Sequence, residues 1–133
     1  MQNVLSNSKK IAILGLSPDP QKPSNKVAKY LQEKGYSIIP IYPKGGEILG
    51  VQAYTSLQDA FQDQKDIDLV NVFRKSEALL EVAQEILNLP YLPKCVWVQL
   101  GLSNKDAKIL LENAGITYFE NACIKIEHQR IFQ

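Results

Sequence analysis

A continuous apolar run near the start of the chain, Ile11 to Leu14, limits the possible folds more than any other feature. Its β-branched residues and its lack of polar alternation predict a strand that is buried on both faces, as in the middle of a parallel sheet. Gly15 follows directly, and Ser24 is expected to cap the N-terminus of a helix. A strand, a glycine turn and a helix start together present free backbone N–H groups to an anion.

The rest of the chain alternates apolar runs of strand length with segments of helical periodicity. Further strands are expected over residues 37–42, 48–54, 67–73, 94–100 and 116–119, and further helices after Thr55-Ser56, Ser76 and Ser103. Pro40 cannot donate to a strand ladder, which favours a weakly paired strand over residues 37–42. This alternation predicts an α/β fold, with a mostly parallel sheet of about five to six strands and helices on both faces.

The chain of 133 residues is expected to hold one folded domain. Residues 1–8 are predicted to be a flexible lead and residues 9–133 the domain, with residues 120–133 as its tail. The formal net charge of +1 gives no global field for nucleic acid or an anionic membrane. No apolar run approaches the roughly 20 residues that span a bilayer, and no signal peptide is recognisable, so a cytoplasmic location is expected.

The expected strand ends carry groups suited to a phosphate-bearing nucleotide, because ligands of open α/β sheets bind beyond the carboxyl ends of the strands. Four tips contribute: Gly15-Leu16-Ser17, Tyr42-Pro43-Lys44, Phe73-Arg74 and Gln99-Leu100-Gly101. They supply glycines for close approach, cations and a hydroxyl. Alternatives that involve no ligand remain open. In these, Gly15 serves packing only, Lys44 is a solvated surface lysine, and Arg74 is paired with a carboxylate. Ser17 and Ser24 then only form turns and caps.

Lys44 narrows the ligand class. An NAD site usually has an acidic residue at the tip of the second strand, where it bonds the ribose diol. Here that tip is Tyr42-Pro43-Lys44, with no carboxylate before Glu47. A lysine there favours an additional phosphate on the ribose, as in coenzyme A or NADP. The glycine spacing does not match the dinucleotide fingerprint.

The cysteines and the histidine suggest little chemistry. With two cysteines and one histidine, neither a disulfide framework nor a metal site is predicted. Cys95 and Trp97 are expected in the core and His128 on the surface. Cys123 is expected in the tail, where its thiol is either silent or reactive. No catalytic residue is predicted, because no nucleophile–base pair or carboxylate dyad is visible.

Several of these segments, in unbroken order over roughly residues 9–128, resemble the small stand-alone CoA-binding domain proteins. The resembling segments are Gly15-Leu16-Ser17-Pro18 with Pro23-Ser24, residues 27–32, residues 36–44, residues 68–74, residues 96–101 and the tail Cys123-Ile124-Lys125-Ile126-Glu127. These proteins are similar to the CoA-binding domain of the succinyl-CoA synthetase α chain. The resemblance implies a single Rossmann-like three-layer domain.

The resemblance also implies positions for the ligand. The Gly15-Leu16-Ser17 loop would lie against the pyrophosphate of coenzyme A, and Pro43-Lys44 would border the adenosine and its 3′-phosphate. Val72-Phe73-Arg74 would line the nucleotide cleft. The first hypothesis is therefore a CoA-binding module without catalytic activity. The alternatives are a small NADP-linked or redox enzyme, and a regulatory protein that captures the CoA thiol through Cys123. Protein partners are not predicted.

Overall fold

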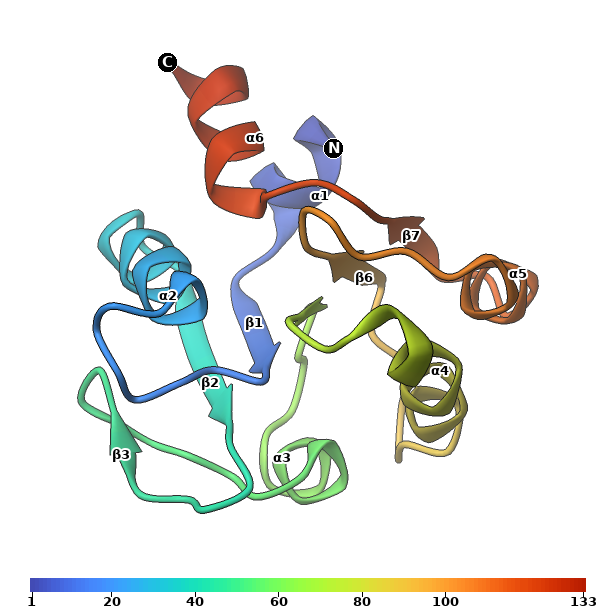
Figure 1. Ribbon diagram of the computed structural model, residues 1–133, viewed down its shortest axis with the longest axis horizontal. Coiled ribbons are helices and arrows are strands. Elements are labelled where there is room, and N and C mark those ends of the chain that lie inside the picture. The colour runs from blue at the N-terminus through green and yellow to red at the C-terminus, as the bar shows by residue number, and fades with distance from the viewer.

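The computed structural model describes all 133 residues, and its centre is a parallel sheet of five strands in the order β2-β1-β5-β6-β7 (Figure 1). The strands are β1 (Lys10–Leu14), β2 (Ser37–Ile41), β5 (Leu69–Val72), β6 (Cys95–Val98) and β7 (Thr117–Phe119). Every neighbouring pair is parallel, so the carboxyl ends of all five strands lie at one edge. The order reverses between β1 and β5. The predicted fold class is confirmed.

Helices cover both faces of the sheet (Figure 1). One face packs against α1 (Gln2–Asn7), α2 (Pro23–Glu33) and α6 (Ile124–Phe132). The other packs against α3 (Leu57–Asp63), α4 (Leu79–Leu87) and α5 (Lys105–Asn113), with the short 3-10 turn η1 (Ser76–Ala78) before α4. None of the helices has both the length and the hydrophobicity that spanning a membrane requires.

The apolar run in β1 supplies both cores. Ile11 and Ile13 point into the cluster under α1, α2 and α6, whereas Ala12 and Leu14 point into the cluster under α3, α4 and α5. Successive side chains of a strand alternate between faces, so a strand covered on both sides is apolar throughout. β2 lies at the edge of the five-stranded sheet, which agrees with the position of Pro40 in its sequence.

The strand predicted over residues 48–54 is wrong. The chain instead forms a small antiparallel hairpin of β3 (Glu47–Ile48) and β4 (Val51–Gln52). Leu49 and Gly50 have φ values of 52° and 78°, and these left-handed conformations reverse the chain after two residues. Only Tyr54 reaches the main sheet, through a single parallel bridge to Ile41. The helix start predicted near Ser56 is confirmed, since its side chain accepts from the Asp59 N–H at 3.1 Å.

Both chain ends are helical, in contrast to the predicted lead over residues 1–8 and the predicted tail. Leu5 of α1 is buried, and its carbonyl accepts from the Tyr36 hydroxyl at 2.6 Å. α6 buries Ile124 and His128. His128 is therefore not on the surface: its Nδ1 lies 2.7 Å from the Tyr30 hydroxyl of α2. Leu5 and Ile124 complete the core beneath these two helices, and the partly buried Val4 and Ile131 pack against it.

Candidate functional site

The turn after β1 closes directly against the end of β5, at the point where the strand order reverses. Gly15 has φ 89°, and a Cβ there would lie 2.6 Å from the Phe73 carbonyl oxygen. The Gly15 N–H donates to Ile41 O at 3.2 Å. The glycine is thus required because the backbone of Phe73 occupies the space that a side chain would need. This contact brings the tips of β1 and β5 together.

The loop from β1 to α2 is fastened by side chains. Ser17 N–H donates to Ser24 Oγ at 3.0 Å, and Asn25 Nδ2 donates to Ser17 O at 2.9 Å. Ser24 is therefore not the predicted N-cap: α2 begins at Pro23, and Lys22 occupies the cap position. Leu16 is fully buried in the core. Asn25 was missed by sequence reasoning, because an asparagine one residue beyond an expected cap looks like ordinary helix surface.

A polar cleft of about 420 Å³ opens beyond the ends of β1 and β2. The tips of these strands line it with Gly15, Ser17 and Pro43, and the start of α3 adds Thr55 and Ser56. Lys44 follows Pro43 in an exposed turn and does not line the cleft. It nevertheless lies at the same edge of the sheet as Gly15, as the sequence predicted.

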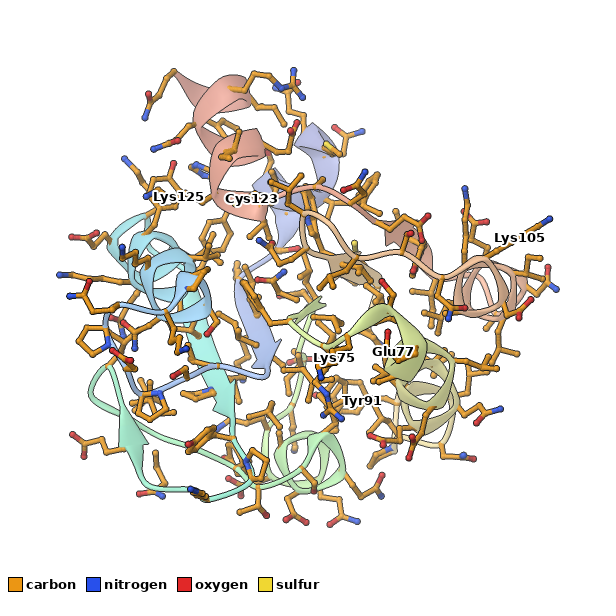
Figure 2. The ribbon with its side chains drawn as sticks, viewed as in Figure 1. Lys75, Glu77, Tyr91, Lys105, Cys123 and Lys125 are labelled. Carbon is orange, nitrogen blue, oxygen red and sulfur yellow. The ribbon has the colours of Figure 1, made fainter.

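A second, mostly apolar cleft of about 520 Å³ opens beyond β5 and β6. Its apolar lining comes from α2, the segment after β6, and α6: Pro23, Val27, Leu100, Leu102 and Ile126. Gln99 and Cys123 contribute polar and sulfur atoms to the lining, and Arg74 and Lys75 add charged side chains. Cys123 is half-buried at the N-cap of α6 (Figure 2). The sequence placed Cys123 in a tail and did not predict that this segment forms a wall of the site.

Arg74 lies at both clefts. It is exposed, and no carboxylate lies within ion-pair distance, since the chain has a single ion pair, between Arg130 and Glu127. Glu85 is the one carboxylate residue that lines a cleft together with Arg74, without forming an ion pair with it. Lys75, which follows Arg74, lines the apolar cleft as well and is labelled in Figure 2. A cation between a polar and an apolar cleft can bind an anionic group in the middle of a long ligand.

Residues 9–129 match the family described as the CoA binding domain. The chain belongs to this family. It is 41% identical over 128 residues to the uncharacterized protein YneT of Bacillus subtilis (strain 168), a match that covers 96% of this chain and 91% of that protein.

Solved structures agree with the fold of this CoA binding domain. The structure of cell-free ID.343 from Thermus thermophilus has a TM-score of 0.88 at 36% identity, covering 98% of this chain and 96% of that one. A hypothetical protein from Pyrococcus horikoshii OT3 has a TM-score of 0.87 at 34% identity, covering 99% and 89% of the two chains. Both are similar over essentially the whole domain, so the clefts lie in a part of the fold that the relatives share.

Besides Leu16, Ser24 and Lys44, two further predicted site residues line neither cleft of the CoA binding domain. Val72 is fully buried in β5 and packs in the core. Gly101 is exposed, and its N–H donates to the Asn121 side chain at 2.7 Å, which ties the segment after β6 to the connection between β7 and α6. The predicted residues Phe73, Arg74 and Gln99 all line the apolar cleft. The clefts open at strand ends that the sequence analysis named, but only some of the predicted residues line them.

The two thiols of the CoA binding domain differ in environment. Burial raises the pKa of the Cys95 thiol to about 12, which leaves it protonated and inert at neutral pH. Cys123 lies at the apolar cleft instead. No group of three histidine, cysteine, aspartate or glutamate side chains is arranged to hold a metal ion.

Proposed function

We propose that the protein binds coenzyme A or an acyl-CoA across the two clefts and carries out no reaction on its own. Coenzyme A has a polar nucleotide end, a charged pyrophosphate in the middle and a long, mostly apolar pantetheine arm. The protein presents matching environments in the same order: a polar cleft, Arg74, and an apolar cleft. Family membership supports the same ligand.

The single observation that carries this proposal is the unpaired Arg74 at the junction of the clefts. In the proposed complex its guanidinium contacts the pyrophosphate, together with the positive end of α2. The adenosine lies in the polar cleft beside Pro43, and the exposed Lys44 reaches its 3′-phosphate. Ser17 and Ser24 hold the loop that faces the phosphates.

The polar groups at the clefts support binding more than catalysis. They are a guanidinium, an ammonium, hydroxyls, an amide, the Glu85 carboxylate and a thiol. The histidine of the chain lies elsewhere, buried against Tyr30, and cannot serve Cys123 as a base in this arrangement. We therefore place the protein among CoA-binding modules rather than enzymes.

Calorimetry with coenzyme A and 3′-dephospho-CoA tests the proposal. We expect the wild-type protein to bind coenzyme A more tightly than the dephospho form. Lys44→Ala should weaken coenzyme A binding by about 1–3 kcal/mol, which corresponds to roughly tenfold to a hundredfold, and should remove the difference between the two ligands. Lys105→Ala is the matched control, because Lys105 lies on α5, away from the clefts (Figure 2).

Equal affinity of the wild-type protein for the two ligands would show that Lys44 does not bind the 3′-phosphate. A thermal shift with NADPH and none with coenzyme A would instead favour the NADP-linked enzyme.

The position of Cys123 at the apolar cleft favours a second candidate function, regulation through capture of the CoA thiol. In thiol–disulfide exchange, the Cys123 thiolate attacks one sulfur of CoA disulfide, forms a protein–CoA disulfide and releases one CoA thiolate. Intact mass after incubation with CoA disulfide should show one adduct, which reductant removes. The adduct should be absent from Cys123→Ser, and an adduct that persists in that variant would end this candidate.

A further inference from the structure

A buried polar pair lies behind the apolar cleft, where the surrounding positions are apolar. Asn71 is in the middle of β5, fully buried between Ile13 of β1 and Trp97 of β6. Gln99 follows β6 and is only 5% exposed. Asn71 Nδ2 donates to Trp97 O at 3.2 Å and to Gln99 Oε1 at 3.1 Å. Two buried amides in a core of this kind require an explanation, because burying them costs free energy unless they are bonded.

Backbone partners determine how both amides are oriented. The Ile124 N–H donates to Gln99 at 3.0 Å, and a backbone N–H can only donate, so the receiving atom is Oε1. The Trp97 carbonyl can only accept, so the Asn71 atom facing it is Nδ2. The orientation of each amide is thus set by the chain itself, without any choice between oxygen and nitrogen.

Two atoms remain after these bonds are made. Asn71 Oδ1 is enclosed and has no hydrogen-bond partner, the one such side-chain atom in the chain. Gln99 Nε2 makes no bond within the chain, and its residue lines the apolar cleft. The pair therefore carries an unpaired acceptor inside the core and presents an unpaired donor to the cleft. The core tolerates this cost in order to hold Gln99 in one orientation.

The chemistry of the donor indicates its ligand. A neutral N–H₂ in an apolar wall is satisfied by a neutral acceptor, and a carbonyl oxygen is the common one. We propose that Gln99 Nε2 recognises an amide or thioester carbonyl of the ligand's arm, and that Asn71 is the positioning residue that aims it. This inference rests on the proposed function, in which the arm of coenzyme A, with its two amides, occupies this cleft.

The same bonds connect the donor to α6, which forms part of the cleft wall. Gln99 Oε1 accepts from the first residue of α6, whose N-cap Cys123 makes no side-chain cap bond. Cys123 and Ile126 of α6 line the same cleft. Gln99 therefore takes the place of a capping side chain for α6 while its other amide atom faces the ligand, so one residue fixes both the wall and the donor.

The test compares whole coenzyme A with the same molecule cut off at its pyrophosphate, adenosine 3′-phosphate 5′-diphosphate, by calorimetry. Gln99→Glu keeps an oxygen for Ile124 and Asn71 but offers no donor. Gln99→Met removes the donor without adding charge, and with it the oxygen that accepts from Ile124 and Asn71, so Gln99→Glu is the variant that isolates the donor. We expect both variants to lose about tenfold or more in affinity for coenzyme A, as for the loss of a ligand hydrogen bond in an enclosed site. Affinity for the truncated ligand should stay within about twofold of wild type.

Gln84→Glu is the matched control for the charge change, because Gln84 is exposed on α4 and lines neither cleft. Unchanged coenzyme A affinity in both Gln99 variants would overturn the inference. So would an equal loss for the two ligands, because Gln99 would then act on the whole site and not on the arm. Failure of the wild-type protein to bind coenzyme A would overturn the proposed function and this inference together, whereas the first two outcomes leave the proposed function intact.

Discussion

The two faces of the sheet bury different kinds of side chain. The face under α3, α4 and α5 packs a hydrophobic cluster of 21 residues and holds none of the buried polar residues. The face under α1, α2 and α6 packs a smaller cluster of 15. All five buried polar residues lie on this second side, in or directly after strands of the sheet or in the helices that cover them. They are Ser24, Asn25, Asn71, Gln99 and His128.

This difference teaches where stability and binding reside. Apolar side chains on the first face contribute burial without any requirement for a partner. On the second face each polar group needs a specific partner, and Asn71 Oδ1 has none. The apolar cleft opens on this second face, between α2 and α6. We infer that the buried polar side chains of the second face lower the stability of the fold but orient the groups that contact a ligand.

The largest expected effect comes from the first face. Leu111→Ala on α5 removes a side chain that is 1% exposed in the cluster of 21 residues. We expect the free energy of unfolding to fall by about 2–5 kcal/mol, from lost burial and the cavity left behind. Chemical denaturation measures it, and Ile109→Ala, on the same helix at 48% exposure, is the control. Coenzyme A affinity of the folded Leu111→Ala protein should be unchanged; a weakened affinity would contradict the division between the faces.

A smaller effect, dependent on pH, is expected at His128 on the second face. Burial first, and then the nearby Lys34 charge, hold the pKa of His128 below its usual value. The folded state therefore binds its proton later than the unfolded state as pH falls. The free energy of unfolding should decrease below about pH 6.5, down to the folded pKa, with a slope that cannot exceed about 1.4 kcal/mol per pH unit.

Denaturation of the wild-type protein and of His128→Asn, between about pH 8 and pH 5, measures this slope. The variant should lose less stability on acidification, because it lacks the titrating group next to Tyr30. Identical slopes for the two proteins would show that the second face is not sensitive to this proton.

The smallest change in stability is expected for Asn71→Leu. The variant loses two donated hydrogen bonds but also removes an enclosed oxygen that has no partner. These contributions oppose each other, so the free energy of unfolding should stay within about 1 kcal/mol of wild type. Coenzyme A binding should nevertheless weaken, since Gln99 is no longer aimed. A stability loss as large as that of Leu111→Ala would mean that Asn71 serves the core and not the cleft.

Sequence patterns predicted the strands of the central sheet more successfully than the segments around it. The run at β1 and the apolar segment of β6 specify buried strands, because periodicity depends only on nearby residues. The segment 48–54 was misread because Leu49 adopts a left-handed conformation that its side chain does not signal. α6 was missed because only Ile124 and His128 of its residues are buried, too few for a clear helical pattern.

The candidate site was predicted in the same uneven way. Gly15, Ser17, Pro43 and Arg74 were expected at the strand ends, and they line the clefts. The bonds of Ser24, and those of Gln99 to Ile124, could not be predicted, since they join residues that are not related by any local repeat.

By itself the sequence determined an alternation of strands and helices, and hence a parallel sheet whose carboxyl edge carries a glycine and the side chains of lysine and arginine. Tertiary structure alone decided that Asn71, Gln99 and Ile124 form one hydrogen-bonded chain, with partners 28 and 25 residues apart. The physical reason is that burial preferences repeat along a few residues, whereas the partner of a polar atom depends on how strands are registered and on where a distant helix begins.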